Sequence, residues 1–312
     1  MLTLIVALTL GGLASACKPA TSQLPSTSPS QPATPPRHSP ASRSQPPPPP
    51  PLPLPIPFPD SVVFERAVAG ADAVPRIPIA GARIVVIPHH WPVGHLALAA
   101  LRDAVPPPGG WQRAIVLGPD HPNRGAAFAT TSARGWRGAS GSVAPDVDGV
   151  AALIASGAAV RDDGLVAQEH GVAGVLPAVR WAIPAARVLP VAVRGDAPAG
   201  EAERLAGALA PLIERDTLVV LSVDFAHGVL PAEAEQRGAE SIAALAALDG
   251  ARLLGWSDEH LDARGAVRTA MALARRLGAT RWVLRERTDG SRLPRYEGGP
   301  VTSYVVGYYV GP

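Results

Sequence analysis

The sequence predicts an α/β fold, a three-layer α/β/α sandwich in which a mainly parallel central sheet lies between helices. Apolar runs rich in β-branched residues alternate along the chain with Ala- and Leu-rich stretches that have helical spacing. The apolar runs are continuous, as expected for strands whose two faces are both covered by helices. These two patterns, together with a length that can bury a large core, predict the fold class.

The expected elements follow from the same patterns. Strands are expected at the short apolar runs, over 83–87, 114–117, 188–193, 217–223, 282–285 and 303–310. Helices are expected where apolar residues recur every three or four positions, over 93–104, 147–156, 172–181, 200–214, 232–248 and 265–277. Residues 60–312 are therefore predicted to form one α/β domain.

Residues 18–59 are predicted to be a disordered, proline-rich linker. They hold 17 of the 36 prolines of the chain, and a segment of this composition can form neither a helix nor a packed core. Where it adopts polyproline II, the chain extends by about 3 Å per residue. The linker should therefore act as a semi-rigid spacer ahead of the domain.

Residues 1–17 resemble the signal peptide of a bacterial lipoprotein. An apolar run over 2–10 is followed by small residues that lead to Cys17, the only cysteine of the chain. The resemblance implies cleavage before Cys17 and acylation of its sulfur, which predicts an extracytoplasmic domain, lipid-anchored to a membrane of the cell envelope. The sequence departs from the pattern because no Lys or Arg precedes the apolar run and Ala14 stands where Leu is usual. An ordinary cleaved signal peptide or an uncleaved anchor is the alternative.

The charge pattern excludes some classes of function. The net charge is +2, and acidic and basic residues are mixed along the folded part, so no nucleic-acid partner is expected. No lysine follows Lys18, which excludes Schiff-base chemistry and a lysine general base in the domain.

Three histidines follow the expected strands at the points where these end. His89 comes after the run that ends at 87, His121 after the run that ends at 117, and His227 after the run that ends at 223. Because the carboxyl ends of parallel strands meet at one edge of a sheet, these imidazoles should converge there. We predict that His89, His121 and His227 are metal ligands.

Other polar residues are expected near the same edge. Asp224 stands three residues before His227 and is predicted to bind the metal or to orient that histidine, with a helix N-cap as the alternative. Glu169 is a candidate general acid or base and His170 a candidate proton donor or substrate contact. The alternative for both is that they begin a helix on the surface.

Two local expectations concern the neighbours of these histidines. His90 should point away from the site, because adjacent residues of an extended chain face opposite sides. His95 and His260 are expected outside the site. The segment GPDH, 118–121, should form a tight turn in which Gly118 lets the chain reverse sharply.

Imidazoles and a carboxylate without a thiolate suit Fe(II), Zn²⁺ or Mn²⁺. Two histidines and one carboxylate with open positions would indicate Fe(II) and O₂ chemistry, whereas three histidines would also suit zinc. The third ligand is left open between these alternatives.

Six motifs occur in an order that resembles the Memo-like family, also called AmmeMemoRadiSam system protein B. They are PHH after the first strand, LGPDHPNRG, ATTSARGW, QEHGVAGVLPAV, SVDFAH and the terminal TSYVVGYYV. The resemblance implies a fold similar to that of class III extradiol dioxygenases, which hold non-haem iron with two His and one Glu. It also implies a divalent metal, iron or copper, at His89 and His121.

One departure from the family pattern affects the expected metal site. The family often has a Cys-Gly near the start of the last long helix, and Arg264 is expected at the position of that Cys. The third ligand is therefore expected from His227, Asp224 or Glu169. The leading interpretation is a membrane-tethered, metal-binding protein which, if catalytic, is a non-haem-iron, dioxygenase-like oxidoreductase acting on a small molecule. A zinc-dependent hydrolase and a non-catalytic binding domain are the alternatives.

Overall fold

A computed structural model describes residues 52–56, 58–196, 198–294 and 296–311. The predicted signal peptide, Cys17 and the linker up to residue 51 lie outside these residues. The strands are β1 (Leu54–Pro55), β2 (Ala82–Ile87), β3 (Arg113–Asp120), β4 (Ala129–Thr131), β5 (Trp136–Gly138), β6 (Gly141–Val143), β7 (Val160–Arg161), β8 (Arg187–Arg194), β9 (Thr217–Ser222), β10 (Arg281–Asp289) and β11 (Ser303–Val310). The helices are α1 (Ser61–Ala73), α2 (Gly94–Asp103), α3 (Val147–Ala155), α4 (Asp163–Gln168), α5 (His170–Ala173), α6 (Leu176–Ala182), α7 (Ala199–Leu209), α8 (Pro231–Ala247) and α9 (Arg264–Arg276).

The central sheet has eight strands in the order β10-β11-β2-β9-β3-β8-β4-β7. Its four middle strands, β2, β9, β3 and β8, run parallel to their neighbours in this group. The antiparallel pairings lie toward the edges, where β10 pairs with β11, β11 with β2, and β4 with β8. The sheet is therefore mixed, with the predicted parallel arrangement at its centre.

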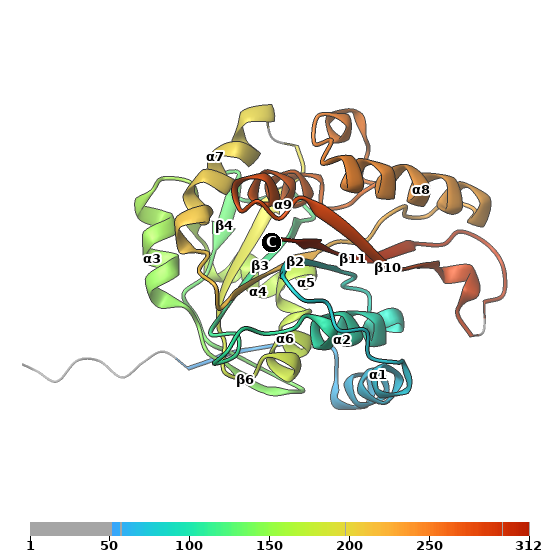
Figure 1. Cartoon of the computed structure of the whole chain (residues 1–312), viewed down its shortest axis with the longest axis horizontal. Helices are drawn as coiled ribbons and strands as arrows, with labels where there is room; N and C mark the ends of the chain where they lie inside the picture. Colours follow the sequence, from blue (N-terminus) through green and yellow to red (C-terminus); the bar gives the residue numbers. More distant parts are fainter. Residues whose placement is uncertain (1–51, 57, 197, 295, 312) are drawn as a thin grey trace, which may run out of the picture. The chain divides into compact units, whose positions relative to one another are not determined.

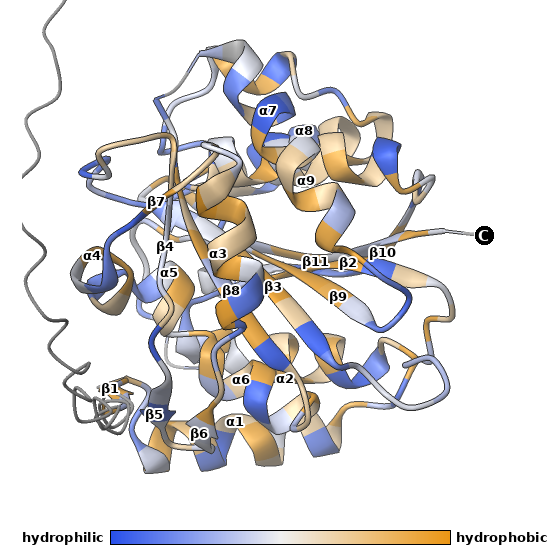
Figure 2. Cartoon of the chain, turned by 90° about the vertical axis from the view of Figure 1, so that its left-hand side faces the viewer, coloured by the Kyte–Doolittle hydropathy of each residue, from blue (hydrophilic) through white to orange (hydrophobic). Residues whose placement is uncertain are grey.

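Helices cover both faces of the sheet and complete three layers. Val85 and Ile87 of β2 belong to one apolar core with α1, α2 and α6, whereas Ile84 and Val86 belong to a second core with α7 and α9. Figure 1 shows these two groups of helices on opposite sides of the sheet. The middle strands are apolar on both faces, as the hydropathy colours of Figure 2 show. The predicted fold class is confirmed.

The structure refines several expected boundaries. The helix expected over 172–181 is two helices, α5 and α6. Pro177 lies in the first turn of α6, where the N–H that proline lacks would have no partner within the helix. The long helices α8 and α9 and the strand β11 occur where they were expected. The short strands β4 to β7 and the helices α1 and α4 were not predicted.

The last residues of the predicted spacer join the fold before its expected end at 59. Leu54–Pro55 form β1, which pairs in parallel with β5, and Ile56 is buried in the core next to Gly138. Pro55 lies on an edge strand, where the missing N–H of proline is tolerated. The composition that predicts a spacer thus does not exclude a short edge strand.

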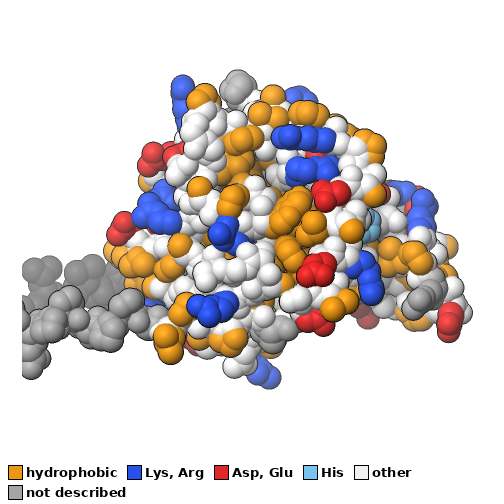
Figure 3. Space-filling view, turned by 90° about the horizontal axis from the view of Figure 1, so that it is seen from below, with side chains coloured by type: hydrophobic (Ala, Val, Ile, Leu, Met, Phe, Trp, Pro, Cys, Tyr) orange, Lys and Arg blue, Asp and Glu red, His pale blue; other side chains and the backbone are white. Residues whose placement is uncertain are grey.

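Within the described ranges, no helix is both long enough and apolar enough to cross a membrane. On the face drawn in Figure 3, arginine and acidic side chains are interspersed with apolar ones. The charge on this face is therefore mixed in sign.

A buried ion pair ties the edge of the sheet to a helix, and it can be tested. Arg285 of β10 and Asp103 at the end of α2 are 2.8 Å apart, with side chains 2% and 0% exposed. Asp103→Ala should lower the free energy of unfolding by about 3 kcal/mol, the lower end for a broken buried pair, because Glu286 remains near Arg285. Urea denaturation measures this loss. The control is Asp148→Ala, whose side chain is exposed and whose loss should change stability by less than about 0.5 kcal/mol; equal effects would contradict the prediction.

Candidate functional site

Three adjacent parallel strands end at the same edge of the sheet. Ile87 of β2 pairs with Ser222 of β9, and Leu221 of β9 pairs with Leu117 of β3. His89 follows β2, His121 follows β3 and Asp224 follows β9, so each enters the site from its own strand. The ring centroids of His89 and His121 lie 5.2 Å apart. The parallel centre of the sheet is what brings these distant segments together.

His89 is held so that Nε2 faces the centre of the cluster. Its other ring nitrogen, Nδ1, lies 3.3 Å from Ser222 Oγ, and its backbone N–H donates to Asp224 Oδ1 at 3.1 Å. Nε2 lies 3.2 Å from Asp262 Oδ2 but has no hydrogen-bond partner among the described residues. Burial alone would lower the pKa of His89, but the carboxylates of Asp224 and Asp262 raise it above its usual value.

Glu169 orients His121 in the same way. Its Oε1 lies 2.6 Å from His121 Nδ1 and accepts the N–H of Gly171, while Oε2 accepts the backbone N–H of His121. Burial alone would lower the pKa of His121, but the carboxylates of Asp262 and Glu169 raise it to about 10. Both carboxylate oxygens are engaged, which favours an orienting role for Glu169 over the acid–base role that the sequence predicts.

Asp262 is the residue that sequence reasoning missed. Its Oδ2 lies 3.2 Å from His89 Nε2, 3.5 Å from His121 Nε2 and 3.6 Å from His227 Nε2. Its Oδ1 accepts the backbone N–H of Asp224. Although burial favours the neutral acid, the surrounding histidines hold the pKa of Asp262 below its usual value. A carboxylate at the centre of three imidazoles completes a set of donors that a cation would need.

The side chain of Arg264 points away from this arrangement and supplies no ligand. Its Nη1 donates to Trp256 O at 2.5 Å and its Nη2 to Asp258 Oδ1 at 2.8 Å, outside the histidine cluster. Helix α9 begins so close to β8 that a Cβ on Gly265 would lie 2.0 Å from Arg194 O. This contact fixes the start of α9, and it is Asp262, just before the helix, that faces the histidines. In the sequence, the presence of a carboxylate two residues before Arg264 could have indicated this ligand.

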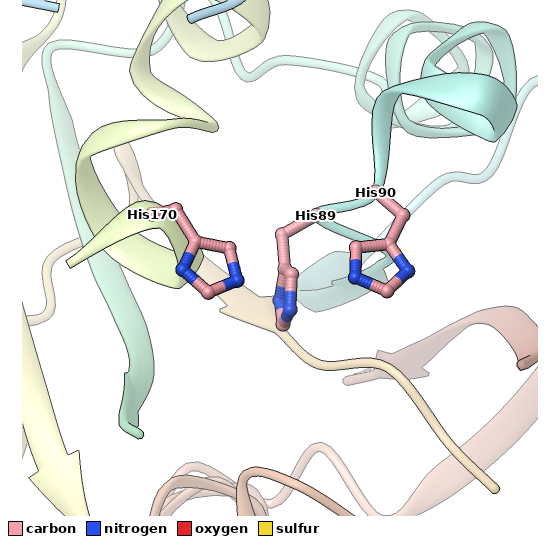
Figure 4. A group of neighbouring side chains, drawn as sticks. All are labelled: His89, His90 and His170. Carbon is pink, nitrogen blue, oxygen red and sulfur yellow. The ribbon is translucent and has the colours of Figure 1, made fainter. Parts of the chain in front are cut away.

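The expectation that His90 points away is wrong. Its Nδ1 lies 2.7 Å from Asp224 Oδ2, and its ring centroid lies 5.3 Å from that of His89. Figure 4 shows the ring of His89 between those of His90 and His170. The alternation of side chains holds only within the strand, which ends at Ile87, whereas His90 caps the short 3₁₀ helix Trp91–Val93. The chain turns there, so both imidazoles reach the carboxylate of Asp224.

The remaining predicted residues lie around this centre. His227 joins His90 and Asp224 in a group whose donor atoms all lie within 4.8 Å of one another, whereas His89 and His121 form such a group with Asp262. His227 thus adjoins the other two predicted ligands and does not share their group. His170 stacks on His121 with centroids 4.2 Å apart, and its side chain is 58% exposed.

Gly118 has a different role from the one expected. Residues 118–120 continue β3 and pair with β8, so the tight turn expected there is absent and the chain turns after Asp120. A Cβ on Gly118 would lie 2.5 Å from Gly171 O. The glycine is therefore needed for the close approach of β3 to α5, the helix that His170 begins.

A cavity of about 450 Å³ opens beside the cluster. His121, Glu169 and His170 line it together with Asp120, Arg124 and Gln168. His95 lines a separate cavity next to α1, and His260 stacks on Trp256. Neither belongs to the candidate metal groups found among the described residues, as the sequence predicts.

Two sequence comparisons support the resemblance to the Memo-like family. A family model described as Memo-like protein matches residues 66–308. A MEMO1 family protein of Methanopyrus kandleri is 31% identical over 145 residues, which are 45% of this chain and 51% of that protein. The chain thus matches about half the length of this curated relative. The crystal structure of an uncharacterised protein from Escherichia coli K12 aligns at 11% identity with a TM-score of 0.43, covering 73% of this chain and 99% of that one.

The contact at Gly118 provides a test of how the site is held together. Gly118→Ala should force α5 away from β3 and lower the free energy of unfolding by about 1–3 kcal/mol, the usual cost of overpacking. Chemical denaturation of the full chain measures this change. The matched control is Gly200→Ala in α7, where a Cβ meets nothing and stability should stay the same or rise by up to about 1 kcal/mol. A neutral Gly118→Ala variant would disprove the close contact.

Proposed function

This chain belongs to the Memo-like protein family, and we propose that it binds a divalent metal ion through His89, His121 and Asp262. One observation carries the proposal. His89 Nε2 and Asp262 Oδ2 are buried 3.2 Å apart, and neither makes a hydrogen bond within the described part of the chain. Buried polar atoms are normally paired, and unpaired ones that converge indicate a missing partner. A cation supplies a partner for all three donor atoms.

The donor set favours Fe(II). Two imidazoles and one carboxylate on one side of an ion leave its other positions open, which is the pattern of non-haem iron oxygenases. When bound, such an ion would supply a redox-active centre for O₂ and substrate. Zinc and copper also accept imidazole and carboxylate ligands, so metal analysis of the protein has to distinguish them from iron.

The chain's own residues fix and surround these donors. Ser222 and Glu169 contact the Nδ1 atoms of His89 and His121, which leaves both Nε2 atoms directed at the ion, an arrangement that typically tunes a metal site. His170 borders the cavity of about 450 Å³, a size that suits a small-molecule substrate. We assign His170, rather than the fully engaged Glu169, to substrate contact or proton transfer.

Two alternatives lead to different experiments. His227 Nε2 lies 3.6 Å from Asp262 Oδ2, so a third imidazole is near the ion, and a zinc-dependent hydrolase is the second candidate. Arg264 at the position of a family ligand would favour a non-catalytic binding domain. Asp262 offers a carboxylate two residues before Arg264, so the absence of that ligand does not favour this alternative.

We also propose that Cys17 is lipidated and tethers the domain outside the cytoplasm. The apolar run over 2–10, the small residues before Cys17 and the proline-rich spacer behind it support this proposal. The spacer would hold the domain away from the bilayer surface.

The metal proposal is tested by anaerobic reconstitution with Fe(II) or Zn²⁺, followed by metal analysis. Wild type should retain iron, and Asp262→Ala should lose most of it because a charged ligand is removed. Arg264→Ala is the control and should retain iron like wild type, since its side chain contacts Trp256 and Asp258. Equal iron in Asp262→Ala and wild type would refute the ligand set.

O₂ uptake by the Fe(II) form would support the oxygenase, whereas tight Zn²⁺ binding without O₂ uptake would support the hydrolase.

The tether is tested independently of the metal. Cys17→Ser should move the full chain from the membrane fraction to the soluble fraction, because it removes the residue that would carry the acyl chains of the tether. Fractionation followed by immunoblotting measures this shift, with Ser15→Ala as the control. Unchanged membrane association of Cys17→Ser would count against lipidation.

A further inference from the structure

A second group of donors lies directly beside the first. His90 Nδ1 is 2.7 Å from Asp224 Oδ2, and His227 contributes a ring nitrogen within 4.8 Å of the other donor atoms of this group. The ring centroids of His90 and His227 lie 5.7 Å apart. Tyr304 Oη approaches the same nitrogen of His90 at a longer distance, 3.4 Å. The proposed function does not use His90 or His227 as ligands.

The two aspartates are held in the same way. In each, Oδ1 accepts a backbone N–H, that of His89 for Asp224 and that of Asp224 for Asp262. In each, Oδ2 is buried, faces the imidazoles and accepts no hydrogen bond from residues that the structure describes. The side chains are 0% and 5% exposed. Asp224 therefore directs an oxygen without a hydrogen bond at His90 and His227, as Asp262 does at His89 and His121.

The two groups are close enough to act together. Asp224 Oδ2 lies 3.8 Å from His89 Nε2, and Asp262 Oδ2 lies 3.6 Å from His227 Nε2. Each aspartate thus borders the histidines of the other group. Paired metal ions in enzymes typically lie about 3.5–4 Å apart and share bridging ligands, which matches this arrangement of donors.

We propose that His90, Asp224 and His227 form a second divalent-cation site, so that the protein holds a pair of metal ions with Asp224 and Asp262 between them. This inference rests on the first site described under the proposed function. A second cation would give Asp224 Oδ2 its missing partner, as the first does for Asp262 Oδ2.

Metal stoichiometry tests the second site directly. The full chain is dialysed anaerobically against Mn²⁺ or Zn²⁺, and bound metal per protein is measured by mass spectrometry. Wild type should hold two equivalents, and His90→Ala should hold one, because His90 forms a group with Asp224 and His227 and does not belong to the group of His89, His121 and Asp262. In the Mn²⁺ form, the electron paramagnetic resonance spectrum of wild type should show a coupled pair, and that of His90→Ala an isolated ion. Circular dichroism verifies folding of the variant.

Controls separate this inference from the first proposal. His95→Gln, which lies in another cavity, should keep two equivalents, and His227→Ala should reproduce the His90→Ala result. The contrary result is a wild type that binds only one equivalent of metal, which His90→Ala keeps and His121→Ala loses. That result would overturn the second site and leave the proposed function standing. Two equivalents in His90→Ala would place the second ion elsewhere and also overturn it. No bound metal in wild type would overturn both.

Discussion

The buried carboxylate of Asp262 is the constraint on which the site depends. Its Oδ2 is nearly inaccessible to water and lies within 3.6 Å of three imidazole nitrogens. An ionised carboxylate without a partner is very costly to bury, and proteins stabilise one by pairing it or by binding a metal. The surrounding histidines therefore have to be protonated, or a cation has to lie between them and the carboxylate. Either choice makes the arrangement of His89, His121 and His227 inseparable from Asp262.

The fold supplies that arrangement through close backbone contacts. The ends of β2, β9 and β3 set the spacing of the histidine-bearing segments, because parallel pairing fixes their register. Gly118 lets β3 approach α5, and Gly265 lets α9 approach β8. These two glycines bring Glu169 and Asp262 to opposite sides of His121. The site is thus a consequence of how the helices pack on the sheet edge. The placement of its side chains depends on Gly118 and Gly265, where a larger residue would keep the helices away from the sheet.

The sequence predicts the parts of this site that follow from regular structure. His89 and His121 were found because strand ends in parallel sheets converge, and the order of motifs indicated the family that the family model confirms. His90 was misjudged because side-chain alternation fails where the chain turns after β2. Asp262 was missed because its position depends on the packing of α9 against β8 across some seventy residues of sequence. The short strands β1 and β4 to β7 were missed because two- or three-residue strands carry no periodic signal.

The contrast between Asp224 and Glu169 explains why a second ion is a stronger inference than an extended hydrogen-bond network. Both carboxylates touch a histidine Nδ1 at under 3 Å. Both oxygens of Glu169 are engaged by hydrogen-bond donors, as expected for a residue that only orients its neighbour. In Asp224 the oxygen nearest the imidazoles accepts no hydrogen bond from the described residues, although His90 is close enough to donate one. A nitrogen and an oxygen that lie close together without hydrogen-bond geometry are expected where both atoms bind the same cation. The same geometry recurs between His89 Nε2 and Asp262 Oδ2.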